Sequence, residues 1–159
     1  MTDARTRLYS DVPNGHLVEY EGKQFAMLYD WRFPVEGGDW RPFGGKAMVD
    51  DLGPAEQPVN RWRRWRQAYR RRLLQVLITK HEYHLLGWWT EADLRHETKR
   101  YVSWFRERRF RNELAALVKE KLVIHASPFE LSGQAPTYEV SSLGVVAAAR
   151  MGLCKYPYI

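Results

Sequence analysis

The sequence predicts an α+β protein in two parts, a strand-rich first part and a helix-rich second part. Residues 16–20 and 24–33 favour strands, and a Glu-Gly-Lys turn separates them, which predicts a hairpin. From residue 61 onward the apolar residues recur with the period of an α-helix. We therefore predict an N-terminal β-hairpin extension over 1–60 and a second domain over 61–159.

The predicted hairpin is expected to bury one side of each strand. Its candidate inward positions are Leu17, Phe25, Met27 and Tyr29. Two stretches rich in Gly, Pro and Asp follow, PVEGGDWRPFGGK and DDLGPAEQPVN, and the second is predicted to be a linker that ends near Asn60.

Composition favours a protein of a reducing compartment. The chain has 159 residues and one cysteine, Cys154, so it cannot form an internal disulfide. The N-terminus has no apolar signal region, and no apolar run reaches the length of a membrane span. We expect a cytoplasmic protein with no membrane partner.

Charge is unevenly distributed along the chain. Residues 1–60 hold six basic and ten acidic residues, whereas 61–159 hold nineteen basic and nine acidic residues. The stretch RWRRWRQAYRRRLLQVLITK, residues 61–80, has seven arginines, one lysine and no acidic residue. This uneven charge predicts a positive surface that binds a polyanion or an acidic protein.

The basic stretch is predicted to form one amphipathic helix. Its apolar residues fall within a stripe of roughly 120° that is expected to face the core. These residues are Trp62, Trp65, Tyr69, Leu73, Val76 and Leu77. On this interpretation the tryptophans belong to the core, and the arginines form either an ordinary solvated face or a phosphate-binding one.

Two more helices are predicted downstream. Thr90 is an N-cap candidate with acidic residues in the turn after it, so a second helix should run from Glu91 to about Tyr101. A third should run from about Trp104 to Lys121. Its expected inward positions are Phe110, Leu114, Leu117, Val118 and Lys121.

The end of the chain predicts a second hairpin and a last helix. Residues 122–125 and 137–141 favour strands, and SPFELSGQAP between them favours a long tip. LGVVAAARMGLCKYPYI starts as a helix of small residues and is stopped around Gly152 and Pro157.

This order of elements, with two local sequences, resembles a winged helix-turn-helix domain. NELAALVKEKLVI resembles the end of a recognition helix that leads into the first wing strand. APTYEVSSLGVVAAA is similar to the second wing strand and following helix of MarR- and PadR-like regulators, through Tyr138, Val140, Ser141 and Gly144. The resemblance covers about residues 62–150. It implies three helices, a β-hairpin wing and a C-terminal helix. The interval from Thr90 to Phe110 is longer than in a compact helix-turn-helix, and RYVSWF has no glycine for the turn.

The resemblance implies a double-stranded DNA-binding transcriptional regulator. The third helix of such domains enters the major groove, where Arg reads guanine and Asn reads adenine. The implied contacts are Arg108, Arg109, Arg111 and Asn112 at base edges, and Lys119, Arg95, Lys99, Arg100, Arg64 and Arg71 at phosphates. Ion pairs with Glu107 and Glu113 are the competing role for the third-helix arginines. The small residues of VVAAARMGL would permit a homodimer through the last helix.

A protein-interaction module is the alternative function. The expected wing tip contains Glu130 and no Lys or Arg, and the extension over 1–60 carries a net charge of −4. Both features favour an acidic or nucleic-acid-mimicking protein partner, as for a phage-type inhibitor of a host polymerase or nuclease.

No enzyme, metal or cofactor is predicted. His81 and His84 have a metal-compatible spacing but lack an evident third ligand. GGDWRPFGGKA lacks the spacing of a phosphate-binding loop. Asp50 and Asp51 are adjacent and should diverge, which makes them poor partners for acid–base chemistry.

Overall fold

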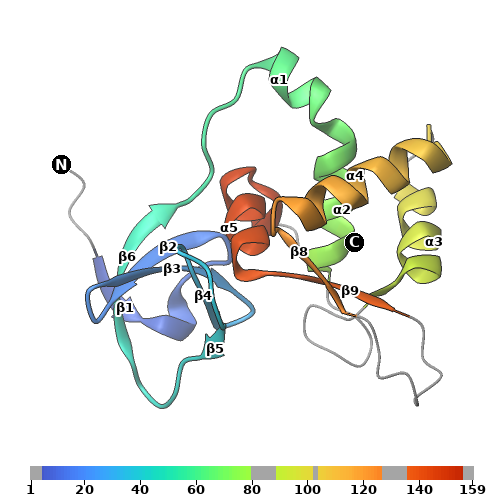
Figure 1. The fold of residues 1–159 in the computed structure, drawn as a ribbon. Coiled ribbons are helices and arrows are strands. Elements are labelled where there is room, and N and C mark those ends of the chain that lie inside the picture. The colour runs from blue at the N-terminus through green and yellow to red at the C-terminus, as the bar shows by residue number, and fades with distance from the viewer. Residues whose placement is uncertain (1–4, 80–88, 102–103, 127–135, 156–159) are drawn as a thin grey trace, which may run out of the picture. The chain divides into compact units, whose positions relative to one another are not determined.

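The computed structural model describes residues 5–79, 89–101, 104–126 and 136–155. The α+β class is confirmed, with five α-helices and antiparallel sheets in the described part (Figure 1). The chain forms two compact units: unit 1 contains Met1–Pro58 and Ser142–Tyr156, and unit 2 contains Val59–Ser141 with Pro157–Ile159.

Unit 1 is built on a six-stranded antiparallel sheet. Its order is β1-β6-β2-β3-β4-β5, so the first and last long strands of the segment pair with each other. The strands are β1 (Arg5–Leu8), β2 (His16–Tyr20), β3 (Lys23–Leu28), β4 (Trp31–Pro34), β5 (Arg41–Pro42) and β6 (Met48–Pro54). One cluster of its core contains Val12, Val18, Phe25, Met27, Phe43 and Val49.

The predicted N-terminal hairpin is present as β2 and β3, and the predicted second strand divides in two. Tyr20 pairs with Lys23 across the first turn. At the second turn Tyr29 and Asp30 have φ values of 54° and 64°, and Leu28 pairs with Trp31. Two residues with positive φ form the kind of tight turn that matches strand twist. Tyr29 is therefore a turn residue, whereas Phe25 and Met27 are buried as predicted.

The predicted last helix exists but belongs to unit 1. α5 (Ser142–Arg150) contacts β3 and β4, so its placement in the 61–159 domain was wrong. Ser142 Oγ donates a hydrogen bond of 2.6 Å to the Gly38 carbonyl oxygen. The reason is packing, since the small residues of α5 allow close approach to the sheet, and most of them are buried. The extension was predicted to end at residue 60, and the first segment of unit 1 ends two residues earlier, at Pro58.

The described residues of unit 2 form four helices and a three-stranded antiparallel sheet in order β7-β9-β8. Its elements are α1 (Arg61–Arg66), α2 (Ala68–Ile78), β7 (Trp89–Thr90), α3 (Glu91–Tyr101), α4 (Glu107–Lys119), β8 (Val123–Ala126) and β9 (Thr137–Val140). The second predicted hairpin is therefore confirmed as β8 and β9. The sequence did not predict β7, a two-residue strand that pairs with β9.

α3 and α4 form where the sequence predicts. The backbone N–H of Asp93 donates to Thr90 Oγ1 at 3.2 Å, which confirms Thr90 as the cap. α4 buries Phe110, Leu114 and Leu117, but Lys121 is exposed with φ of 64°. The Lys121 and Leu122 N–H groups donate to the Val118 and Leu117 carbonyl oxygens, so the helix ends in a Schellman turn that leads into β8.

The single helix predicted over residues 61–80 is two helices. Gln67, with φ of −93° and ψ of 6°, separates α1 from α2. Tyr69, Leu73 and Leu77 are buried, as predicted. Trp62 and Trp65 are 65% and 69% exposed, so their assignment to the core was wrong. A helical wheel shows which residues share a face, but it does not show whether another element covers that face, and none of the described elements buries these two tryptophans.

Candidate nucleic-acid interface

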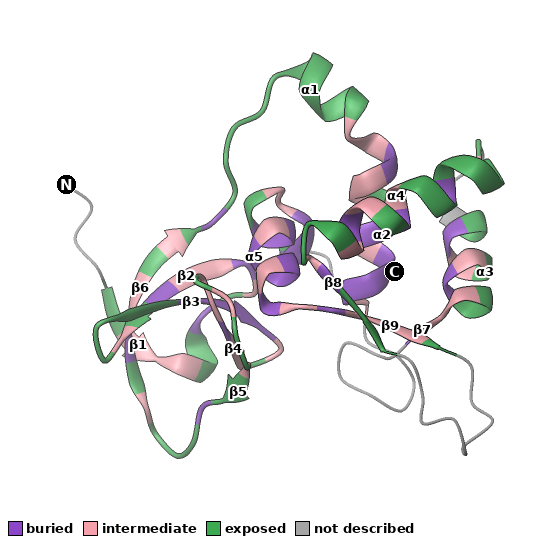
Figure 2. Ribbon diagram, in the orientation of Figure 1, coloured by how far each residue is buried: buried purple, intermediate pink, exposed green. Residues whose placement is uncertain are grey.

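The outward face of α4 carries polar and basic side chains. Arg108, Asn112, Ala115 and Lys119 are three or four residues apart, so they lie in one line along the helix. All four are exposed, and they lie opposite the buried stripe, as Figure 2 shows for the helix as a whole. We call these four residues the α4 face.

The acidic residues of α4 and its C-cap, Glu120, lie outside the α4 face and are paired with arginines. Glu107 Oε1 is 2.7 Å from Arg95 Nε on α3. Glu113 Oε1 is 2.6 Å from Arg70 Nε on α2, and Glu120 accepts hydrogen bonds of 3.1 and 2.5 Å from the same guanidinium. The Glu120 and Glu113 hydrogen bonds raise the pKa of Arg70, against the effect of its partial burial. These pairs neutralise the acids and leave the α4 face with two cations.

Two other α4 arginines have contacts beside the face. The Arg109 guanidinium carbon lies 5.4 Å from the Tyr69 ring centroid and 5.9 Å from that of Trp104. Arg111 Nε is 3.5 Å from Glu107 Oε1. Both residues are exposed, but aromatic packing and the ion pair direct them to opposite flanks of the helix.

The predicted phosphate contacts on α3 are largely engaged within unit 2. Arg95 is ion-paired with Glu91 and Glu107, and its guanidinium carbon lies 5.5 Å from the Phe110 ring centroid. Lys99 Nζ lies 5.1 Å from the Phe105 centroid. Arg100 is 3.3 Å from Glu97. Arg95 therefore fixes α3 against α4, whereas Lys99 and Arg100 remain exposed at the end of α3.

The two predicted phosphate contacts that precede α3, Arg64 and Arg71, also differ in exposure. Arg64 is exposed on α1, and Arg71 is half-buried on α2. The predicted wing tip, including Glu130, lies outside the described residues, as does the interval from 80 to 88. Within the described part, the structure thus places Arg108, Asn112 and Lys119 together on one open face.

A cavity between α4 and the hairpin was not predicted. It has a volume of about 350 Å³ and is lined by Glu91, Arg111, Leu114, Ala115, Val118, His125 and Tyr138. The His125 and Tyr138 rings are cross-strand neighbours that stack at 4.4 Å with planes 3° apart. Burial raises the pKa of Tyr138, and the Glu91 carboxylate adds to this effect. Alternation along the two strands was the available signal, because it directs both rings to one side.

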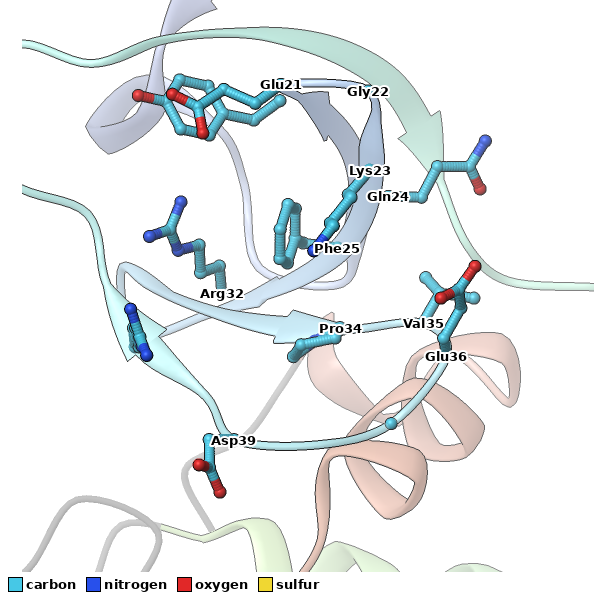
Figure 3. A pocket seen from close by; sticks show the side chains of 13 residues that line it. Glu21, Gly22, Lys23, Gln24, Phe25, Arg32, Pro34, Val35, Glu36 and Asp39 are labelled. Carbon is cyan, nitrogen blue, oxygen red and sulfur yellow. The ribbon is translucent and has the colours of Figure 1, made fainter.

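Unit 1 contains a larger polar pocket of about 740 Å³. The Arg32 guanidinium carbon lies 4.7, 5.3 and 5.5 Å from the ring centroids of Phe43, Phe25 and Tyr20. Figure 3 shows Arg32 beside Phe25, with the side chains of Glu21, Glu36 and Asp39 around the rim. Since the lining mixes basic and acidic groups, it does not select one ligand charge.

A charged cluster joins three strands of unit 1. Asp51 Oδ1 is 2.9 Å from His16 Nδ1 and accepts from the Gly53 N–H at 2.9 Å, and Oδ2 is 3.4 Å from Arg7. Asp50 instead accepts from Thr6 Oγ1, so the two adjacent aspartates diverge as predicted. Burial alone would raise the pKa of Asp51, but the His16 and Gly53 hydrogen bonds and the nearby charges outweigh it and lower that pKa.

Replacing Asp51 with asparagine should make the stability of unit 1 less dependent on pH. Because the folded pKa is below the ordinary 3.8, the carboxylate stabilises the fold fully above that value. This stabilisation is lost as pH falls through the folded pKa. The urea midpoint of Asp51→Asn should therefore be lower than that of the native chain at pH 5, and the difference should shrink by pH 2.5. A difference that stays constant across this range would contradict the assignment.

The described residues contain neither a candidate metal site nor a membrane-spanning helix. Among the described residues, no three His, Cys, Asp or Glu side chains are grouped to hold a metal ion, and His81 and His84 lie outside them. None of the described helices combines the length and apolarity needed to cross a membrane. Searches against known protein families, curated proteins and solved structures found no match.

Proposed function

We propose that unit 2 is a winged helix-turn-helix domain that binds duplex DNA through the α4 face, in a non-enzymatic transcriptional regulator. The order α2, β7, α3, α4, β8, β9 supports this assignment, because helices and wing strands follow each other as in that fold. The sheet order β7-β9-β8 also supports it, since a short strand before the second helix extends the wing. In this fold α4 is the helix that enters the major groove.

One observation carries the proposal: the α4 face has cations and an amide in line, while the acids of α4 are ion-paired beside it. Arg108 and Asn112 are suited to base edges, and Lys119, about three turns from the helix start, is suited to phosphate. Arg95 and Arg70 have a supporting role, because they hold Glu107, Glu113 and Glu120 away from the DNA. Without these pairs the acids would repel the phosphate backbone.

The combined variant Arg108→Ala/Asn112→Ala/Lys119→Ala should bind duplex DNA about tenfold or more weakly than the native chain. The measurement is fluorescence anisotropy of a labelled mixed-sequence duplex at low salt. The control Arg5→Ala/Lys46→Ala removes the same charge from exposed positions of unit 1 and should change affinity by less than about threefold. Equal losses in both variants would reduce the effect to net charge and contradict the proposal.

A protein-interaction module is the second candidate, because the stacked Trp62 and Trp65 rings are exposed in a protein whose residues 1–60 carry a net negative charge. An example is an inhibitor that docks on a host polymerase or nuclease. Affinity capture from a nuclease-treated lysate distinguishes the two functions. A stoichiometric protein partner that survives the nuclease, together with no duplex binding by the pure chain, would replace the first candidate with the second.

A further inference from the structure

α1 is a short, defined helix with an aromatic face. The Asn60 side chain accepts a hydrogen bond of 2.8 Å from the Arg63 N–H, which caps the helix. The helix ends at Gln67. Trp62 and Trp65 are three residues apart and share one face. Their ring centroids are 5.5 Å apart with planes at 27°, so the two indoles form a stacked pair.

This aromatic pair lies in solvent. About two thirds of each tryptophan is exposed, and α1 is exposed along its whole length in Figure 2. Tyr69, one turn further on, is fully buried, so the aromatic residues are exposed on α1 and become buried at the start of α2. Indole rings carry a large apolar area, and exposed rings that are held together mark a surface that binds a partner.

The rest of α1 defines the charge of that partner. The remaining four residues of the helix are exposed arginines: Arg61, Arg63, Arg64 and Arg66. Among the described residues, none of these guanidinium groups forms an ion pair with a carboxylate. Arginine combines charge with a planar group that stacks on rings, so α1 offers two indole faces and four forked donors to one ligand.

We propose that α1 binds single-stranded nucleic acid, with unpaired bases stacked on Trp62 and Trp65 and phosphates bound by the flanking arginines. Bases of a duplex are stacked on one another and do not offer their faces to a side chain. An unpaired strand offers planar bases and phosphates together, which matches the alternation in RWRRWR. An acidic peptide would satisfy the arginines but would leave the indoles without planar partners. An anionic membrane would require a wider apolar face, including aliphatic residues, which α1 does not have.

This site is separate from the α4 face and does not depend on it. The α4 face reads an intact groove, whereas α1 requires bases that are free of a complement. A labelled 20-nucleotide oligo(dT) is the suitable probe, because thymidine runs form no stable secondary structure of their own. Its affinity for the native chain is measured by anisotropy at low salt.

Trp62→Ala/Trp65→Ala should bind oligo(dT) about tenfold or more weakly than the native chain, because two stacking contacts are lost. Trp62→Phe/Trp65→Phe keeps aromatic rings and should stay within about threefold of native affinity. The combined α4-face variant should also stay within that range. All three variants change exposed residues, and unchanged thermal unfolding by circular dichroism confirms that each is folded.

Three results would overturn the proposal: native-like oligo(dT) binding by Trp62→Ala/Trp65→Ala, no oligo(dT) binding by the native chain, or binding to phosphatidylserine vesicles in its place. Failure of duplex binding with normal oligo(dT) binding would contradict the α4 proposal and leave this one standing.

Discussion

Phe110→Ala should lower the free energy of unfolding of unit 2 by about 3–5 kcal/mol. Phe110 is fully buried, its ring centroid lies 5.6 Å from that of Phe105, and the Arg95 guanidinium carbon lies 5.5 Å away. Removing the ring leaves a cavity between α3 and α4 and removes the surface on which Arg95 rests. Because Arg95 also pairs with Glu107, the loss should loosen the start of α4.

The measurement for Phe110→Ala is the urea midpoint by circular dichroism, together with amide hydrogen exchange in α4. Phe110→Leu is the matched control, because it keeps most of the apolar volume and should lose less than half as much. If Phe110→Ala had the same urea midpoint as the native chain, the Phe110 ring would not hold α4 in place.

Arg70→Met should destabilise unit 2 by about 2–3 kcal/mol, less than the roughly 3–5 kcal/mol lost when a fully buried pair is broken, because its partners are partly exposed. Arg70 is the common partner of Glu113 and Glu120, so its loss leaves two carboxylates without a cation beside the α2–α4 contact. The Glu113 side chain is only 23% exposed, so water compensates little there, whereas Glu120 is 48% exposed and is hydrated more easily.

Removing the two carboxylates as well tests the physical cause of this loss. The variant Arg70→Met/Glu113→Gln/Glu120→Gln should recover more than half of the stability lost in Arg70→Met, because uncharged amides cost less to bury. Urea unfolding at one pH compares the three chains. No recovery in the combined variant would mean that packing of the arginine side chain, and not its charge, supports the contact.

Local sequence signals predicted much of unit 2. The Thr90 cap determined the start of α3, and the spacing of Phe110, Leu114 and Leu117 identified the buried side of α4. The α4 face lies on the opposite side of the helix from these buried residues. These features depend on residues within one or two turns of each other, so they can be predicted from a short window.

The errors arose where distant packing decides the outcome. Trp62 and Trp65 have core-like spacing, but only a neighbouring element could bury them, and none within the described part of the chain does so. α5 follows β9 directly in the chain and yet packs on β3 and β4, because the sheet of unit 1 contacts its small residues. Similarly, the sequence indicated neither that Arg95 would be held by Glu91 and Glu107 nor that Arg109 would stack on Tyr69.

The correction to the tryptophans changes the functional interpretation of the basic stretch. As part of one long helix, its arginines would form a flanking positive surface. As the exposed α1, the same residues offer rings and guanidinium groups to solvent together. Unit 2 therefore carries two candidate surfaces, α1 for unpaired bases and the α4 face for duplex DNA.

The salt dependence of duplex binding tests the central proposal most directly. Each cation that contacts a phosphate contributes a slope of about −0.9 to log affinity against log salt concentration. The native chain should therefore show a steep slope. The Arg108→Ala/Asn112→Ala/Lys119→Ala variant should be shallower by about 1–2. If the slopes of the native chain and this variant are the same, the α4 face does not contact DNA.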